Sequence, residues 1–480
     1  MLTMDFVEPE KVGMSSHRLE RIGPVMQTYV DSGKIAGLST LIARKGQVVH
    51  SGQVGMMDIE SQTPMSPDTI FRIYSMTKPV VCVALMTLYE QGRFQLSDPV
   101  MKFLPVFSKP VVLECDAEGN RKEVKADRPI TVHDLFTHTA GLTYDFLEDS
   151  PVAELYRQAR FFNRADRTLA EFVGDLARLP LAFQPGSRWH YSLAIDVLAH
   201  LTEVISDQPF AQFLENKIFT PLGMADTNFY VQSPKCDRIA TMYGLPDLGT
   251  PDMTLSKLVN AWESGFNERI DVSATYPDSK QAGFARGGHG LFSTVPDYVR
   301  FAQMLLNGGE LEGTRILGRK IVELMHSNHL SPKLLPFKVA DPPDYGYGFG
   351  LGSRVLLNVA ESQKPGSVGE YGWAGAAKTY YWVDPQEEII GNGNLPGFSN
   401  VTLWKPSYRA DITKVMKAGN NKLEIKVTNQ WSNRQAGDRI VQQEERVLNT
   451  GVSGRGGFGG RGSQLDPSGL IGHVKVLLRK

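Results

Sequence analysis

Residues 75–92 read SMTKPVVCVALMTLYEQG, and this stretch decides the architecture around it. The segment from Pro79 to Gln91 is apolar almost all round and precedes Gly92, which predicts a helix buried on most faces and ended by a C′ glycine. Pro79 is tolerated there because it lies in the first turn. Ser75 and Lys78 therefore lie at the start of the helix, one turn apart on the same face.

The Ser-x-x-Lys spacing at residues 75–78 suits a nucleophile and its base. The dipole at a helix N-terminus favours negative charge, and a lysine among valine, isoleucine and methionine side chains is desolvated. Desolvation favours the neutral amine, which can accept the serine proton. A chain of 480 residues holds roughly two such motifs by chance, and the alternative is a serine N-cap followed by a surface lysine.

A tyrosine at a second helix start is the candidate partner of this lysine. Residues 189–193 read WHYSL, follow the turn QPGS at 184–187 and open a helix. Tyr191 at such a junction can aim its phenol across a cleft. Near Lys78 it would lose its proton more easily, act as general base for Ser75 and later protonate the leaving group. The alternative is a ring packed in the core with its hydroxyl on a backbone carbonyl.

Residues 372–376, GWAGA, precede a β-prone segment at 379–383 and form the third candidate element. Small residues on an edge strand let the backbone approach a ligand closely. The N–H groups of Ala376 and Ser75 could then form an oxyanion hole. The alternative is a plain turn with a packed Trp373.

The flanking segments predict a discontinuous α/β domain around a helical one. An amphipathic helix from Ser15 to Gly33 precedes strands at 38–43 and 47–54 with a turn at Arg44-Lys45-Gly46. Helices follow at 169–179 and 193–206, and strands at 290–293 and 378–390 enclose a helix at 296–306, rebuilding one sheet. The predicted parts are 1–104 (α/β), 105–289 (helical), 290–398 (α/β) and 399–480 (a β-rich extension).

The composition excludes several classes of protein. The formal net charge is −1, so no overall field attracts nucleic acid or an anionic membrane. The three cysteines form neither a disulfide framework nor a Cys-x-x-Cys motif, which favours a reducing compartment. No stretch is apolar enough for a signal segment or a membrane span, and a cytoplasmic enzyme acting on a small molecule is expected.

Together with residues 135–142 (LFTHTAGL) and 287–294 (GGHGLFST), the three motifs resemble the serine β-lactamase superfamily, most of all class C β-lactamases and family VIII carboxylesterases. The resemblance spans residues 8–395 in the order found in the family. It implies an antiparallel sheet flanked by helices, with an inserted all-helical domain. It also implies Ser75 as nucleophile and Lys78 with Tyr191 as the base pair. Trp373, Ala374 and Gly375 replace the family's Lys-Thr-Gly, and Ser192 and Tyr144 join them in binding substrate.

Two departures from the family indicate the substrate. Class C β-lactamases carry Tyr-x-Asn where this chain has Tyr191-Ser192-Leu193, and a cationic Lys-Thr-Gly where it has Trp373-Ala374-Gly375. Losing the cation favours neutral acyl esters over β-lactams. Lys378 imitates the missing lysine but lies beyond Gly375 and is interpreted as a strand residue.

The sequence therefore predicts a carboxylesterase that hydrolyses short-chain acyl esters through an acyl-enzyme on Ser75. No cofactor is needed. No Gly-x-Ser-x-Gly elbow and no metal-binding cluster occurs, and His133 and His138 are interpreted as structural. The alternatives are a β-lactamase or D-aminopeptidase, an acyltransferase, and a binding protein without catalysis.

The last 80 or so residues resemble part of a galactose-binding-like β-sandwich of glycoside hydrolases. Residues 401–413, 423–428 and 474–478 predict strands, and carbohydrate contact is one hypothesis for this extension. A structural appendage is the other. The glycine-rich run at 451–462 holds only two arginines, which favours a flexible loop over an RNA-binding repeat.

Overall fold

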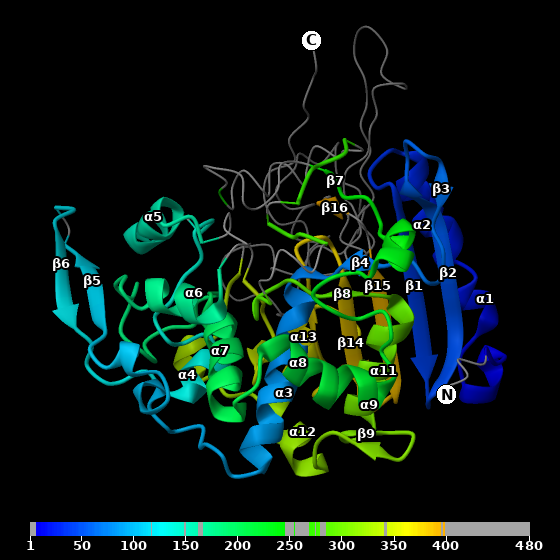
Figure 1. The fold of residues 1–480 in the computed structure, drawn as a ribbon. Helices are drawn as coiled ribbons and strands as arrows, with labels where there is room; N and C mark the ends of the chain where they lie inside the picture. The colour runs from blue at the N-terminus through cyan, green and yellow to red at the C-terminus, as the bar shows by residue number, and fades with distance from the viewer. Residues whose placement is uncertain are drawn as a thin grey trace, which may run out of the picture. The chain divides into compact units, whose positions relative to one another are not determined.

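An antiparallel sheet of eight strands forms the frame of the computed structural model (Figure 1). The structure describes residues 6–394, except 117, 148–149, 162–166, 245–253, 255–267, 274, 279–284 and 340–342, together with 397–398. Chain contacts group Met1–Trp404 in one unit and Lys405–Lys480 in another. In spatial order the strands are β11 (Tyr347–Phe349), β12 (Arg354–Leu356), β13 (Tyr371–Ala374), β14 (Tyr380–Asp384), β15 (Ile389–Asn394), β1 (Gly37–Arg44), β2 (Gln47–Asp58) and β3 (Thr63–Pro64).

The early hairpin is confirmed as β1 and β2. Lys45 and Gly46 form its two-residue turn, with φ of 51° and 73°. Two consecutive left-handed residues are typical of the type I′ turns that match the twist of a hairpin. β1 then pairs with β15 on its other side, so the two ends of the α/β domain share one sheet.

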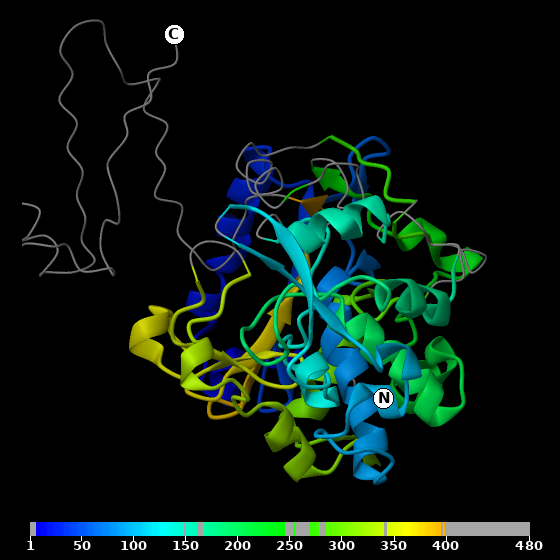
Figure 2. The same cartoon turned by 90° about the vertical axis from the view of Figure 1, so that its left-hand side faces the viewer.

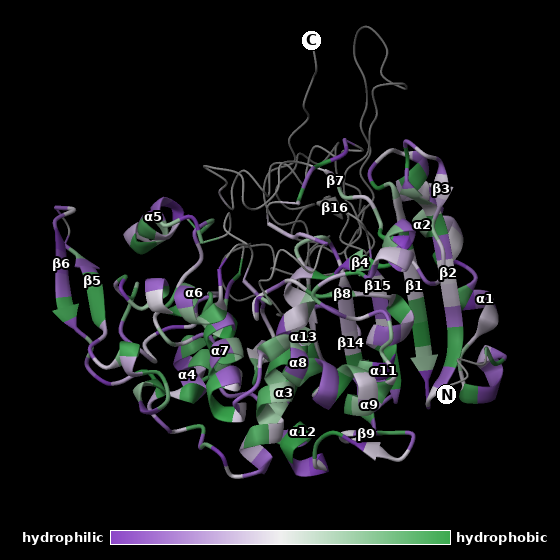
Figure 3. Ribbon diagram, in the orientation of Figure 1, coloured by the Kyte–Doolittle hydropathy of each residue, from purple (hydrophilic) through white to green (hydrophobic). Residues whose placement is uncertain are grey.

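The helix predicted after Ser75 is α3 (Thr77–Glu90), and Gly92 follows it with φ of 72°. Every residue from Thr77 to Leu88 is buried, and Figure 3 shows the helix as largely hydrophobic along its length. It runs between the sheet and the helical region and contacts α7 (Ala194–Ser206). The apolar pattern thus identified the central helix of the fold.

Helix α11 (Val295–Leu306) covers the sheet beside α3. It contacts β1, β14 and β15, and its N-cap Thr294 accepts a hydrogen bond from the Asp297 N–H. The predicted helix at 296–306 is confirmed. Because α11 follows the motif at residues 287–294, it leads the chain from that motif back to the sheet.

The opening helix differs from its prediction. The structure has two helices, α1 (Ser16–Leu19) and α2 (Ile22–Asp31), where one was expected. Pro24 explains the break, because it has no N–H for the Glu20 carbonyl and its ring would clash with that carbonyl. Gly33 ends the segment as expected, with φ of 66°.

The strand predicted at 290–293 does not join the main sheet, which corrects that expectation. Only Phe292–Ser293 (β8) is a strand, and it pairs with β4 (Phe71–Arg72). The Ile73 N–H donates to the Leu291 carbonyl at 3.0 Å, and the Leu291 N–H donates to Thr77 Oγ1 at 3.2 Å. These contacts tie the segment to the start of α3 instead, next to Ser75.

The region from 105 to 289 contains more than helices. Its helices α4 (Val132–Phe136), α6 (Leu169–Leu176) and α7 pack together, but a hairpin of β5 (Val111–Cys115) and β6 (Arg121–Lys125) projects from it (Figures 1 and 2). Valines at the start of β5 favour a strand, and β6 is mostly hydrophilic in Figure 3. The domain boundaries themselves remain a prediction.

The remaining described elements are short and connect these parts. No helix within the described ranges is long and apolar enough to cross a membrane. The strands predicted after residue 398 lie outside the described residues. The short elements are η1 (Pro9–Val12), η2 (Tyr74–Met76), η3 (Val100–Lys102), η4 (Pro105–Phe107), α5 (Pro151–Gln158), α8 (Phe210–Leu214), η5 (Glu215–Phe219), α9 (Thr220–Leu222), η6 (Ser233–Arg238), β7 (Tyr243–Gly244), β9 (Glu310–Leu311), β10 (Thr314–Arg315), α12 (Arg319–Met325), η8 (Pro332–Leu334), α13 (Val359–Ser362) and β16 (Gly397–Phe398).

Candidate active site

Ser75 is presented by a strained turn between β4 and α3. Tyr74, just before it, has φ of 45°, a conformation that non-glycine residues adopt only when their surroundings impose it. The preceding residue, Ile73, is held in place because its carbonyl accepts a hydrogen bond from Thr379 Oγ1 at 2.9 Å, and this contact helps to impose the conformation of Tyr74. Ser75 itself is half-buried, whereas its neighbours Tyr74 and Met76 are buried.

Lys78 lies directly behind Ser75 and is 1% exposed. Its Nζ donates to Ser75 Oγ at 3.0 Å and to the Gly288 carbonyl at 2.6 Å. The same nitrogen lies 4.7 Å from the ring centre of Tyr191 and 5.5 Å from that of Tyr144. Among the described residues no carboxylate pairs with this lysine. A surface lysine behind a serine N-cap, the alternative interpretation, does not describe this geometry.

Tyr191 faces the serine and lysine from the helical region. Its ring is 7% exposed, and its hydroxyl accepts a hydrogen bond from Trp373 Nε1 at 3.3 Å rather than bonding a backbone carbonyl. The loop that carries it is fixed because the His190 N–H donates to the His138 carbonyl at 2.8 Å. The structure therefore brings the three predicted catalytic side chains together from two parts of the fold.

The turn between β13 and β14 closes the site on the side of the sheet. The Gly375 N–H donates to the Thr379 carbonyl at 2.7 Å, and a Cβ on Gly375 would lie 2.3 Å from the Ile73 carbonyl oxygen. Only glycine allows this approach. The Ala376 N–H donates to no acceptor among the described residues, which leaves it for a ligand, as an oxyanion hole requires.

The five predicted substrate-binding residues lie in different settings. Ala374 is exposed at the end of β13, and Gly375 and Trp373 are buried. Ser192 is turned inward, where its hydroxyl contacts His138 Nδ1 at 3.1 Å. Tyr144 is buried beneath Lys78 and stacks on Phe146 with ring centres 4.8 Å apart. Their roles with substrate remain predictions.

Sequence reasoning missed one group of the site. The Gly288 carbonyl accepts a hydrogen bond from Lys78 Nζ. Gly288 belongs to the motif at residues 287–294, but a backbone carbonyl cannot be recognised from the type of side chain. His138, interpreted as structural, lies beside the site, with its ring centre 5.0 Å from that of Tyr191. Burial first and the nearby Lys78 charge second hold the His138 pKa well below its usual range, so this imidazole is neutral at pH 7.

Tyr144 lies in a setting that keeps its hydroxyl protonated. Burial, followed by the neighbouring Tyr191 and Asp196, raises the pKa of Tyr144 well above its usual range. Tyr144 thus keeps its proton and serves as an apolar wall under Lys78. The Tyr191 hydroxyl accepts the hydrogen bond from Trp373 Nε1.

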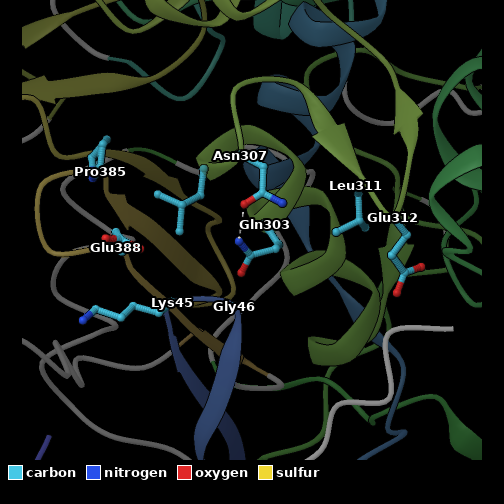
Figure 4. Close-up of a pocket in the computed structure, with 9 residues that line it drawn as sticks. Lys45, Gly46, Gln303, Asn307, Leu311, Glu312, Pro385 and Glu388 are labelled. Atoms are coloured by element: carbon cyan, nitrogen blue, oxygen red, sulfur yellow. Dashed lines mark hydrogen bonds between the residues drawn. The ribbon is translucent and has the colours of Figure 1, made fainter. Parts of the chain in front are cut away.

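A pocket at the opposite end of β14 and β15 lies away from these residues (Figure 4). It is bordered by the β1–β2 turn, the end of α11 and the turn before β15, and Lys45 and Glu388 are charged groups in its wall. No predicted site residue lines it. Within the described parts of the chain no three metal-ligating side chains converge either.

A serine that is hydrogen-bonded to a buried lysine lies at the start of the central helix, beside an eight-stranded antiparallel sheet. This arrangement places the chain in the class of serine hydrolases with the β-lactamase fold. The comparison with protein families agrees. The Beta-lactamase family model matches residues 24–393, and the chain belongs to this family.

Several relatives are similar along most of their length. "Protein Rv1367c" of Mycobacterium tuberculosis is 35% identical over 364 residues, covering 75% of this chain and 85% of the relative. "Esterase EstB" of Burkholderia gladioli is 29% identical over 369 residues, covering 76% and 86%. The solved structure of "EstCE1, a hydrolase with promiscuous acyltransferase activity" is 29% identical, with a TM-score of 0.65, covering 81% of this chain and 96% of that one.

Proposed function

We propose that the protein is a carboxylesterase that hydrolyses short-chain acyl esters through an acyl-enzyme on Ser75. The observation that carries the proposal is the 3.0 Å hydrogen bond between Lys78 Nζ and Ser75 Oγ, made by a buried lysine that has no carboxylate partner among the described residues. An amine in that position can accept the serine proton. The relation to EstB, which is named an esterase, supports the choice of substrate.

Acylation begins when Ser75 Oγ attacks the ester carbonyl and its proton passes to the Lys78–Tyr191 pair. A bond forms between Oγ and the acyl carbon, and the carbonyl oxygen becomes an oxyanion. The N–H groups of Ala376 and Ser75 stabilise that charge. The intermediate then collapses, the bond to the alkoxy oxygen breaks, and the pair returns the proton to the departing alcohol.

Deacylation reverses the roles with water. The Lys78–Tyr191 pair accepts a proton from water as its oxygen attacks the acyl carbon, and the bond to Ser75 Oγ breaks. The serine recovers its proton, and the acid leaves. Trp373 supports this step because its indole N–H is aimed at the Tyr191 oxygen, where it stabilises negative charge.

The walls of the site favour a neutral substrate. Trp373 occupies the place of the cationic lysine in the family motif, and its ring packs on the buried Phe349, with ring centres 5.2 Å apart. An indole at this position offers an apolar face to an acyl group and, unlike a lysine, no ammonium group to a β-lactam carboxylate. Hydrolysis of β-lactams is therefore disfavoured.

Acyl transfer to an alcohol is the second candidate. EstCE1 is described as a hydrolase with acyltransferase activity, and the similarity to it covers most of this chain. The chemistry would differ only in deacylation, where an alcohol replaces water. Product analysis with and without added alcohol distinguishes the two, since transfer yields a new ester at the expense of the free acid.

The test is a parallel assay of p-nitrophenyl acetate and nitrocefin. We expect turnover of the ester, nitrocefin turnover at least a hundredfold slower, and no ester turnover in Ser75→Ala. Ser61→Ala is the matched control, because Ser61 is an exposed serine in the turn after β2. Ester turnover that persists in Ser75→Ala would refute the proposal, and faster nitrocefin turnover would replace it with a β-lactamase.

A further inference from the structure

A buried ion pair lies next to the candidate site without belonging to it. Arg286 and Asp196 are 3% and 0% exposed, and Arg286 Nε lies 3.8 Å from Asp196 Oδ1. The guanidinium also lies over the ring of Phe172, 5.1 Å from its centre. The proposed chemistry makes no use of either charge.

The pair joins the two segments that hold the candidate bases. Asp196 is in the first turn of α7, five residues after Tyr191. Arg286 comes two residues before Gly288, whose carbonyl accepts the hydrogen bond from Lys78 Nζ. One member therefore lies in the helix that directly follows the Tyr191 loop, and the other in the segment that orients Lys78.

The two segments also touch through their backbones. A Cβ on Gly287 would lie 2.3 Å from the Ile195 carbonyl oxygen, and a Cβ on Gly288 would lie 2.4 Å from Asp196 Oδ2. Glycine is required at both positions, so the segment lies directly on the first turn of α7. The carboxylate of Asp196 is thus beside the residue whose carbonyl holds Lys78.

Stability alone does not explain this pair. Within the described chain both oxygens of Asp196 accept no hydrogen bond, and the ion pair is longer than a hydrogen bond. Burying charges costs several kcal/mol each, and apolar residues of similar size often stabilise a core as well or better. In some proteins a buried ion pair is retained because it favours one specific arrangement of the segments it joins.

We infer that Asp196 and Arg286 are positioning residues, which set the distance between Lys78 and Tyr191 by holding residues 286–288 against α7. The inference rests on the proposed function. The pair fixes where the Gly288 carbonyl lies, and that carbonyl fixes where Lys78 Nζ meets Ser75 Oγ. Loosening the pair should slow acylation without weakening substrate binding.

The test compares Asp196→Asn and the double variant Asp196→Asn/Arg286→Met with the wild type. A fluorophosphonate probe measures the acylation rate of Ser75, p-nitrophenyl acetate gives kcat and KM, and thermal unfolding reports stability. Glu312→Gln is the control, because it breaks an Arg300–Glu312 pair of 2.7 Å away from the site. Wild-type labelling on Ser75 checks the proposed function separately.

We expect Asp196→Asn to lower kcat and the labelling rate at least tenfold with KM within about twofold, and to lower the Tm. The double variant should regain part of the lost Tm, because the Arg286 charge is removed together with that of Asp196, but it should not regain kcat. Recovery of both Tm and kcat would overturn the inference, as would an unchanged labelling rate in Asp196→Asn. A wild type that the probe fails to label would sink the proposed function instead.

Discussion

The proposed proton transfers depend on the hydroxyl of Tyr191. It receives one hydrogen bond, from Trp373 Nε1, and its ring faces the Lys78 nitrogen. An N–H aimed at the phenol oxygen stabilises negative charge that develops there during proton transfer. The catalytic role of the pair therefore predicts that the indole N–H matters beyond the packing of its ring.

Trp373→Phe tests this contribution, because phenylalanine keeps an aromatic ring and removes the donor. A hydrogen bond to a charged group contributes about 1.5–3 kcal/mol, so kcat should fall about tenfold or more while KM changes little. Steady-state kinetics with p-nitrophenyl acetate measure the change. If kcat is retained, the indole serves only as a wall of the site.

Asp145 predicts a pH dependence of stability. Burial raises the pKa of its carboxyl to about 7 from a usual 3.8, although the nearby Arg286 lowers it. Between those pH values the folded state binds more protons than the unfolded state. This residue therefore stabilises the fold fully below pH 3.8, and that contribution is lost as the pH rises to about 7.

Asp145→Asn should remove this loss. The free energy of unfolding of the variant relative to the wild type should rise between pH 4 and pH 7, by up to a few kcal/mol at ~1.4 kcal/mol for each pKa unit. Urea unfolding at several pH values supplies the difference. A difference that stays flat across this range would show that the carboxyl is not buried as described.

Helices and turns that depend on neighbouring residues were predicted correctly from local sequence patterns. The apolar run of α3 and the Lys45-Gly46 turn gave the correct helix and hairpin because burial and left-handed φ leave direct signals. Pro24 also indicates the break between α1 and α2, but the apolar spacing on both sides of it favoured one continuous helix. β8 was misplaced because its partner, β4, is a two-residue strand without a pattern of its own.

Two glycines should respond to alanine in opposite ways. A Cβ on Gly46 or Gly23 would meet nothing within 4 Å, so only backbone conformation differs between them. Gly46 has φ of 73°, where alanine costs about 1 kcal/mol, whereas Gly23 lies within α2, where alanine stabilises by about 0.5 kcal/mol. Thermal unfolding of Gly46→Ala and Gly23→Ala gives the two signs; equal signs would contradict the turn or the helix.

The family resemblance predicted the antiparallel sheet and the family, and both are confirmed. The pairing of Arg286 with Asp196 was beyond prediction, because the two residues are distant in sequence and neither carries a motif. The hairpin of β5 and β6 was missed because helices dominate that region. The galactose-binding-like resemblance after residue 398 is not confirmed and falls outside the described residues.

A shortened chain tests which part holds the activity. Ser75, Lys78, Tyr191 and Ala376 all belong to the unit Met1–Trp404. A chain that ends at residue 404 should keep the KM of the full chain and kcat within about threefold. Assays of both chains at equal folded concentration, judged by circular dichroism, provide the comparison. A folded but inactive short chain would place part of the site in residues 405–480.

Mass spectrometry of the protein after reaction with a fluorophosphonate tests the role of Ser75 most directly. We expect one adduct per chain, on the peptide that contains Ser75, and none in Ser75→Ala. Prior incubation with a slowly hydrolysed ester should protect the same residue. An adduct on another residue, in a protein that still hydrolyses esters, would contradict the assignment of Ser75 as the nucleophile.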